Sequence, residues 1–288
     1  MRLGVVLTGM GAHAAAGAGV LRALEERGIE PHCICGMGGG AWPAALHALG
    51  KDAKEIRETI VRAEEMGKRL LAPTASARKL ISGKAQALCD GRWIEKYLLM
   101  QAGHRVLSLA DRPAVFPCRL ARNGQRIVFS TRPFEPEDGR LAMQASVSFA
   151  ARATMAAPPW LAPLPYMGSF LMEEDDLAYA CSLLLQQGAQ RVLLAVPVVS
   201  PKRKPDALDL ACIARQGRAI QAEREAHSGL LRMTMPETVG IAALDRASAC
   251  ELTGYFRARE QLDQLLEDMG MARCRVLPFD RRSTALKQ

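Results

Sequence analysis

The N-terminal part of the chain shows an apolar run, then glycines, then a helical pattern. Val5–Leu7 predicts a short buried strand, and the glycine-rich stretch 9–19 predicts a turn. Apolar residues then recur with helical spacing among charged ones over 20–26, and Gly28 is typical of a helix end. These residues predict a strand, a turn and an amphipathic helix.

The same order follows a second time. The apolar run 32–35 predicts a strand in which alternation places Cys33 and Cys35 on one face, as small apolar groups. Residues 36–40 contain four glycines and lead into a helical stretch over 41–49. A repeated strand, turn and helix is typical of a sheet covered by helices.

The middle of the chain is rich in predicted helix and holds one hairpin. Residues 51–70 and 93–101 predict helices. The apolar runs 114–120 and 126–130 flank Asn123-Gly124, and an Asn-Gly pair between such runs is a strong hairpin signal. We expect two antiparallel strands here.

The remaining chain continues the α/β pattern. Helices are predicted over 141–156 and 177–187, and a buried strand over 191–196. Residues 208–269 are predicted to be mostly helical, and 276–279 to form a last strand. We therefore expect an α/β fold.

The composition agrees with a packed domain. Apolar residues make up 49% and charged residues 24% of the 288 residues, as in a globular protein with a sizeable core. Since neither repeats nor a linker divide the chain, we expect a single domain over 1–280, followed by a short basic tail at 281–288. The sequence shows no secretory signal pattern and no apolar run of membrane-spanning length, so the expected location is cytoplasmic.

Positive charge is in excess but spread along the chain. The net charge is +8, and its clusters are Lys202–Lys204 and Arg281-Arg282. Aromatic residues are not interleaved with them, so no nucleic-acid partner is expected, whereas peripheral contact of Lys202–Lys204 with an anionic membrane stays open. The eight cysteines lack the spacing of a zinc or redox motif, so neither a metal nor a cofactor is expected.

The first sign of chemistry is the glycine loop after the first predicted strand. The loop consists of Gly9, Met10, Gly11, Ala12, His13 and Ala14. Glycines in such a loop let backbone amides approach an anion closely. Two interpretations fit: a dinucleotide-binding fingerprint with Glu30 as the ribose-binding acid, or an oxyanion hole for acyl transfer.

The second glycine loop favours the oxyanion hole. Gly36, Gly38 and Gly40 stand at the glycine and serine positions of a G-x-S-x-G nucleophile elbow, between a strand and a helix. With these loops the chain resembles the patatin-like phospholipase family, whose members open with a strand, a G-G-G-x-R/K-G loop, a helix similar to 19–28 and the elbow. The order and the spacing match.

The resemblance extends over essentially the whole chain. It includes the hairpin within 113–134, a segment at 151–158 similar to A-x-A-S-x-A-I-P, a strand at 188–196 and a G-Y phrase within 252–255. It implies a patatin-like three-layer fold, with a central, mostly parallel sheet flanked by helices. It also implies lipid acyl hydrolysis by a serine and an aspartate, without a cofactor.

The two residues of that reaction are not in place. Gly38 stands at the serine position and offers no nucleophile. The family aspartate aligns with Glu173, although Asp175 or Asp176 occupies that site if the register shifts. The simpler interpretation of residues 173–176 is an exposed acidic turn at the start of a helix, where carboxylates suit the positive helix end.

The predicted oxyanion loop is altered as well. Met10, His13 and Ala14 replace a glycine, a basic residue and a glycine of the family pattern. His13 is a candidate base, but a loop or hydrogen-bonding role is the simpler interpretation. Other candidate nucleophiles lie outside a predicted elbow: Thr8, Cys35 and Ser146.

Three functional hypotheses follow. Losses at several positions of one predicted site favour a catalytically inactive family member that retains a pocket for a lipid or fatty-acyl ligand. The alternative is a residual or relocated acyl-ester hydrolase whose activity would depend on the Glu173 carboxylate. A nucleotide-binding α/β protein is the third hypothesis.

Overall fold

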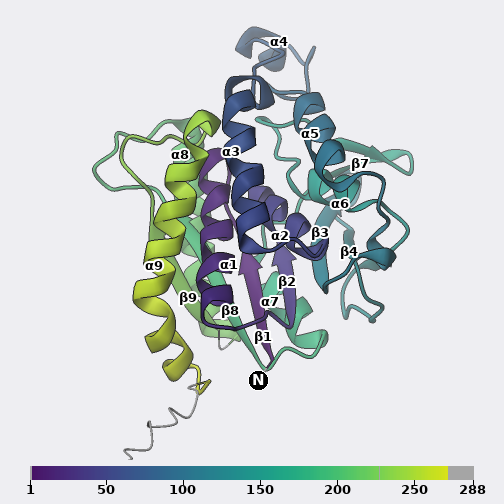
Figure 1. The fold of residues 1–288 in the computed structure, drawn as a ribbon. Helices are drawn as coiled ribbons and strands as arrows, with labels where there is room; N and C mark the ends of the chain where they lie inside the picture. Colours follow the sequence, from purple (N-terminus) through teal and green to yellow (C-terminus); the bar gives the residue numbers. More distant parts are fainter. Residues whose placement is uncertain (1, 227, 272–288) are drawn as a thin grey trace, which may run out of the picture.

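The computed structural model describes residues 2–226 and 228–271 (Figure 1). Within these residues the strands are β1 (Leu3–Leu7), β2 (Cys33–Gly36), β3 (Ala114–Leu120), β4 (Arg126–Ser130), β5 (Arg140–Ala142), β6 (Leu164–Tyr166), β7 (Ser169–Glu173), β8 (Arg191–Val198) and β9 (Gly229–Thr234). The α-helices are α1 (Ala16–Glu26), α2 (Ala41–Ala48), α3 (Ala53–Leu70), α4 (Ala77–Ile81), α5 (Arg92–Ala102), α6 (Val147–Thr154), α7 (Leu177–Gln186), α8 (Ala207–Ala226) and α9 (Ala247–Asp268). Short 3₁₀ helices are η1 (Gly11–Ala15), η2 (Gly38–Gly40), η3 (Leu107–Leu109) and η4 (Leu244–Arg246).

The described strands form one sheet that is mostly parallel, as the sequence predicted. Its main path runs β5-β4-β3-β2-β1-β8-β9. β1 is central and pairs in parallel with β2 and β8, and the pairs β2–β3, β4–β5 and β8–β9 are parallel too. The hairpin predicted around Asn123-Gly124 is the antiparallel pair β3–β4, and β7 pairs antiparallel with β3 and β6.

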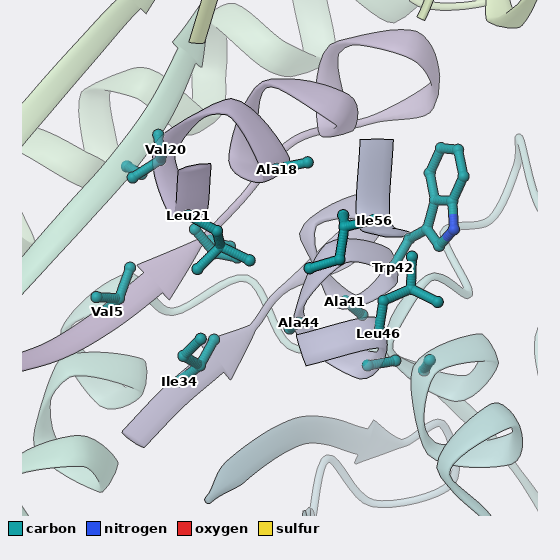
Figure 2. Close-up of a cluster of buried hydrophobic side chains, with 14 of the residues drawn as sticks. Val5, Ala18, Val20, Leu21, Ile34, Ala41, Trp42, Ala44, Leu46 and Ile56 are labelled. Atoms are coloured by element: carbon teal, nitrogen blue, oxygen red, sulfur yellow. The ribbon is translucent and has the colours of Figure 1, made fainter. Parts of the chain in front are cut away.

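Helices cover both faces of the sheet, which gives three layers. Val5 of β1 belongs to the larger core, with side chains of α1, α2, α3 and α9, and Figure 2 shows part of this core. Val6 points to the opposite face and packs with Cys33, Cys35 and helix α7. The two cysteines therefore share one buried face, as their alternation predicted.

Helices α1 and α9 cross at a contact that requires glycine. A Cβ at Gly19 would lie 2.1 Å from the Glu251 carbonyl oxygen, and one at Gly254 would lie 2.2 Å from the Ala16 carbonyl oxygen. The turn predicted over 9–19 is therefore wrong in its second half, because α1 begins at Ala16. Its glycines serve close helix packing instead.

One other prediction is wrong, and another missed a strand. Residues 141–156 are not one helix, because Leu141 lies in β5 and α6 begins only after Ser146, whose Oγ accepts a hydrogen bond from the Phe149 amide. The stretch 208–269 is mostly helical, as predicted, but it also contains β9, which the sequence did not predict. This strand is mostly buried and pairs in parallel with β8.

Most of the remaining predicted elements are present. The helices predicted at 51–70, 93–101 and 177–187 correspond to α3, α5 and α7. The strand predicted at 276–279 and the tail at 281–288 lie outside the described residues, so these two stay predictions.

The helix that follows the second glycine loop carries a buried histidine near its far end. The Nδ1 atom of His47 in α2 accepts a 3.1 Å hydrogen bond from Arg112 Nη1. Because a guanidinium only donates, the imidazole is neutral with its lone pair at Nδ1. Burial, together with the charge of Arg112, lowers the pKa of His47 to about 3.

We expect His47 to make folding sensitive to acid. Its pKa is lower in the folded than in the unfolded chain, so its contribution to stability is present above about pH 6.5 and is lost as the pH falls toward 3. His47→Asn keeps an acceptor for Arg112 but cannot be protonated. In urea unfolding, the stability difference between the wild type and this variant should change by about 2 kcal/mol between pH 8 and pH 5. Parallel pH profiles for the two proteins would contradict this expectation.

Candidate functional site

The two glycine loops lie against each other at the carboxyl ends of β1 and β2. These strands are parallel neighbours, so the chain leaves both at the same edge of the sheet. The Met37 amide donates to the Leu7 carbonyl oxygen at 2.9 Å, and the Gly39 amide donates to the Gly9 carbonyl oxygen at 2.7 Å. The structure thus joins the predicted oxyanion loop and the predicted elbow through their backbones.

The second loop has the shape of a nucleophile elbow. β2 ends at Gly36, Gly38 has a φ of 53°, and α2 begins at Ala41. A left-handed residue between strand and helix gives the sharp turn of a G-x-S-x-G motif. A Cβ at Gly36 would lie 2.6 Å from the Ala41 Cα, and one at Gly40 would lie 2.1 Å from the Leu7 carbonyl oxygen. The turn is present, but position 38 has no side chain.

Two of the first four amides after Gly9 are engaged in hydrogen bonds, and two have no acceptor among the described residues. The Ala12 amide donates to the Ile241 carbonyl oxygen at 2.8 Å, and the His13 amide donates to that of Met10 at 3.1 Å. Among the described residues, no group accepts a hydrogen bond from the amides of Met10 and Gly11. A Cβ at Gly11, which has a φ of 47°, would lie 2.0 Å from the Ile241 carbonyl oxygen, so the loop needs glycine there.

The side chain of His13 is turned into the protein. It is 1% exposed, and its Nε2 lies 2.9 Å from the carbonyl oxygen of Val239. Burial lowers the pKa of His13, although the hydrogen bond to Val239 acts in the opposite direction. The ring is therefore a buried hydrogen-bonding group in the structure.

The acidic run 173–176 matches the predicted exposed turn only in its second half, where the side chains of Asp175 and Asp176 are 43% and 37% exposed. Glu173 ends β7, and its amide donates to the Ala156 carbonyl oxygen at 2.7 Å. Asp176 caps α7 by accepting a hydrogen bond from the Tyr179 amide at 3.1 Å. The run therefore starts a helix, as predicted, but its first half belongs to a strand and to the protein interior.

Glu174 is fully buried between two arginines of the β3–β4 hairpin. Its carboxylate accepts hydrogen bonds from Arg119 at 2.5–2.8 Å and from Arg126 Nε at 3.0 Å. The amides of Asp175 and Asp176 also donate to it, each at 2.9 Å. A buried carboxylate needs such partners, because desolvation otherwise costs several kcal/mol. This arginine clamp, formed by Arg119 and Arg126 around Glu174, holds the turn between β7 and α7.

A cavity of about 240 Å³ lies at this site. Residues of both glycine loops and of the acidic run line it: Met10, Gly11, Gly38, Gly39 and Glu173. Most of the other lining side chains are apolar and come from 70–98, 155–161 and 208–244. Trp42 of α2 also lines the cavity, and its ring packs edge to face with that of Tyr97 at 6.1 Å. An apolar cavity with few polar groups suits a ligand with a large apolar part.

The comparison with known families decides how the site is classified. A sequence model of the patatin-like phospholipases matches residues 5–173, which is more than half of the 288 residues. The chain belongs to the patatin-like phospholipase family. The match begins in β1 and ends at Glu173, so it spans both glycine loops. A search of curated proteins found no match.

Several solved structures are similar to this patatin-like chain at low identity. VipD from Legionella pneumophila is 14% identical, with 91% of this chain and 67% of that chain covered and a TM-score of 0.48. The ExoU–SpcU complex from the type III secretion system of Pseudomonas aeruginosa is 13% identical, with 92% of this chain and 52% of that chain covered and a TM-score of 0.43. Human GIVD cytosolic phospholipase A2, in complex with methyl gamma-linolenyl fluorophosphonate, is 13% identical, with 93% of this chain and 58% of that chain covered and a TM-score of 0.44. The chain thus spans between about half and two thirds of the length of these proteins.

The other candidate nucleophiles of this patatin-like protein are engaged elsewhere. Thr8 Oγ1 donates to the Ala195 carbonyl oxygen at 3.1 Å, and Ser146 Oγ caps α6. Cys35 is buried on the α7 side of the sheet, and burial raises its pKa well above the ordinary value. Within the described part of the chain, none of the three lines the cavity.

Sequence reasoning missed most of the cavity wall. Residues 70–98 and 208–244 are far from the glycine loops in sequence, and their apolar side chains look like ordinary core positions. The signal that could have located them is the charge-poor stretch 70–77, which follows a strongly charged helix. Its apolar residues have no helical or strand period.

The basic loop is less free than its sequence suggests. Lys202 Nζ lies 3.6 Å from Glu237 Oε1, and Arg203 Nε lies 2.8 Å from Asp209 Oδ2. Acids thus oppose two of its three charges. In the described ranges, no helix has the length and apolarity needed to cross a membrane.

We expect the elbow to require glycine at position 40. Gly40→Ala places a Cβ against the Leu7 carbonyl oxygen and should lower the free energy of unfolding by about 2–3 kcal/mol. Gly217→Ala is the matched control, because a Cβ in this helical position meets nothing within 4 Å. It should stabilise the protein by up to about 1 kcal/mol. Urea unfolding measures both, and equal effects would show that the elbow is not tightly packed.

Proposed function

We propose that this patatin-like protein binds a lipid or fatty-acyl ligand in the cavity beside Gly38 and does not hydrolyse it. The observation that carries the proposal is the cavity itself, which combines an apolar wall with the turn of the elbow. An acyl chain would occupy the apolar part. The amides of Met10 and Gly11 are available to its polar end.

The absence of a nucleophile supports the second half of the proposal. Acyl transfer in this family needs an attacking oxygen at the elbow, and glycine provides none. Removal of the nucleophile from a serine hydrolase of another fold lowers kcat about a millionfold. Glu173 adds a methylene at the aspartate position, so the carboxylate too would sit differently from that of an aspartate.

One observation favours the second candidate, a residual acyl-ester hydrolase. Glu173 lines the cavity together with Gly38, whereas Asp175 lies near Arg119 and Arg218, and Asp176 caps α7. A carboxylate in that position can act as a general base toward water. This reaction would not use a covalent acyl intermediate.

The geometry speaks against a nucleotide-binding protein. Glu30 is exposed and precedes β2, whereas the first glycine loop follows β1. Because β1 and β2 are parallel, Glu30 lies at the opposite end of the strands from that loop. A ribose-binding acid would be needed on the same side as the loop.

Ligand binding can be measured through the tryptophans. Trp42 and Trp160 line the cavity, and Trp93 is an exposed residue of α5. We expect dibrominated stearic acid to quench the tryptophan fluorescence saturably. Trp93→Phe is the matched control and should retain this quenching. Ala157→Phe, which fills part of the cavity, should weaken binding at least about tenfold, because a buried phenyl group displaces apolar ligand contacts.

Absence of quenching in the wild type would overturn the ligand proposal. Quenching that Ala157→Phe leaves unchanged would place the fatty acid outside the cavity, with the same consequence.

Hydrolysis is tested with p-nitrophenyl esters and a fluorophosphonate probe. The wild type should give neither turnover nor a covalent adduct, because no side chain stands at position 38. Gly38→Ser combined with Glu173→Asp should acquire the adduct at residue 38, because the turn already has the required backbone. Wild-type turnover that disappears in Glu173→Gln would instead establish the second candidate.

A further inference from the structure

A short loop with its own helix projects next to the cavity. We call residues 74–90 the cap; it contains α4 and lies at one extreme of the molecule (Figure 1). Its two ends are tied together, because the amides of Thr74 and Ala75 donate to the Leu88 carbonyl oxygen at 2.8 and 3.1 Å. The Leu88 amide in turn donates to the Pro159 carbonyl oxygen at 2.9 Å. The cap is therefore a closed loop on a fixed base.

The cap and the chain before it are strongly basic. Residues 66–90 contain five Lys or Arg and one acid, Asp90, which pairs with Arg92 just after the cap. Arg78, Lys79 and Lys84 of the cap are exposed, and within the described residues none of the three forms an ion pair. This differs from Lys202 and Arg203, which acids oppose. An uncompensated cluster of this kind attracts an anionic surface.

The same short segment exposes an apolar side chain. Ile81 of α4 is 87% exposed, the highest value among the exposed large apolar side chains of the described residues. Directly after the cap, α5 exposes Trp93, over whose ring Lys96 Nζ lies at 5.4 Å. Basic residues around an exposed isoleucine, with a tryptophan nearby, are the features of a segment that lies in a lipid headgroup layer.

The cavity wall includes both ends of this loop. Pro73 precedes the cap, Leu88 and Cys89 belong to its base, and all three line the cavity. A surface that held the cap would therefore lie close to the cavity wall. An acidic protein or a nucleic acid could also pair with the basic residues of the cap. Neither partner explains the isolated exposed isoleucine, whereas a bilayer would bury it.

We infer that the cap docks this protein on anionic lipid bilayers, with Ile81 inserted and Arg78, Lys79 and Lys84 against the headgroups. The inference goes beyond the proposed ligand, because the bilayer is a separate partner bound by a separate surface. It also places membrane contact at the cap and not at Lys202–Lys204, where the sequence had left such contact open.

The experiment is co-sedimentation of the full chain with vesicles. The wild type should bind vesicles of equimolar phosphatidylcholine and phosphatidylserine, and should bind phosphatidylcholine alone much more weakly. Binding should fall with added salt. Reversal of the three charges, Arg78→Glu with Lys79→Glu and Lys84→Glu, should weaken it at least about a hundredfold, since each cation near such a surface is worth about fivefold. Ile81→Asp should weaken it about tenfold.

Matched variants test the location. Phe256→Asp changes a side chain that is 57% exposed on α9, and Lys202→Glu with Lys204→Glu changes the other basic cluster. Both should bind vesicles as the wild type does, and thermal unfolding checks that every variant is folded. Unchanged binding of the charge-reversed cap, or loss of binding in the Lys202 variant, would overturn the inference. Displacement of the wild type from vesicles by duplex DNA at equal phosphate concentration would overturn it in favour of a nucleic-acid partner.

Fatty-acid quenching on the same proteins separates the two proposals. The cap variants should still take up dibrominated stearic acid from solution, and Ala157→Phe should still bind vesicles. Loss of quenching with intact vesicle binding would remove only the proposed function. Intact quenching without vesicle binding in the wild type would remove only the docking surface.

Discussion

The site depends on a direct backbone contact between two glycine loops. The Gly39 amide bonds to the Gly9 carbonyl oxygen, and position 40 packs so closely on the Leu7 carbonyl group that no Cβ fits. Protein interiors are close-packed, so such a contact fixes the elements on either side. It sets the point at which α2 begins, and with it the place of Trp42 in the cavity wall. The shape of the elbow thus comes from packing and does not require a reactive side chain.

The opposite side of the site depends on the arginine clamp. Glu173 belongs to a strand that pairs with β3, and the turn that follows is held by charges from β3 and β4. The glycine loops and the clamp are separate structural supports on different strands. Beside both lies an apolar cavity whose wall comes from helices and from the loops between them. The cavity is thus held by two supports that are far apart in the sequence.

The local parts of this arrangement could be predicted from the sequence, and the long-range parts could not. The two strand–glycine–helix units and the Asn-Gly hairpin carry their signal within a few residues. Glu174 looked exposed because four acids in a row suggest solvent, and its partners Arg119 and Arg126 lie some fifty residues earlier. β9 was missed because its partner is distant and its neighbours are helical. The glycines of α1 indicated a turn, although their role is contact with a helix from the end of the described chain.

The left-handed backbone at Gly38 favours glycine over any other residue at this position. A residue with a side chain is strained in that conformation by about 1–3 kcal/mol, whereas glycine adopts it freely. A change from serine to glycine at this position would therefore relieve strain and raise stability. The reverse change would have to overcome that strain before any catalytic benefit appeared, so the step to glycine is easier than the step back.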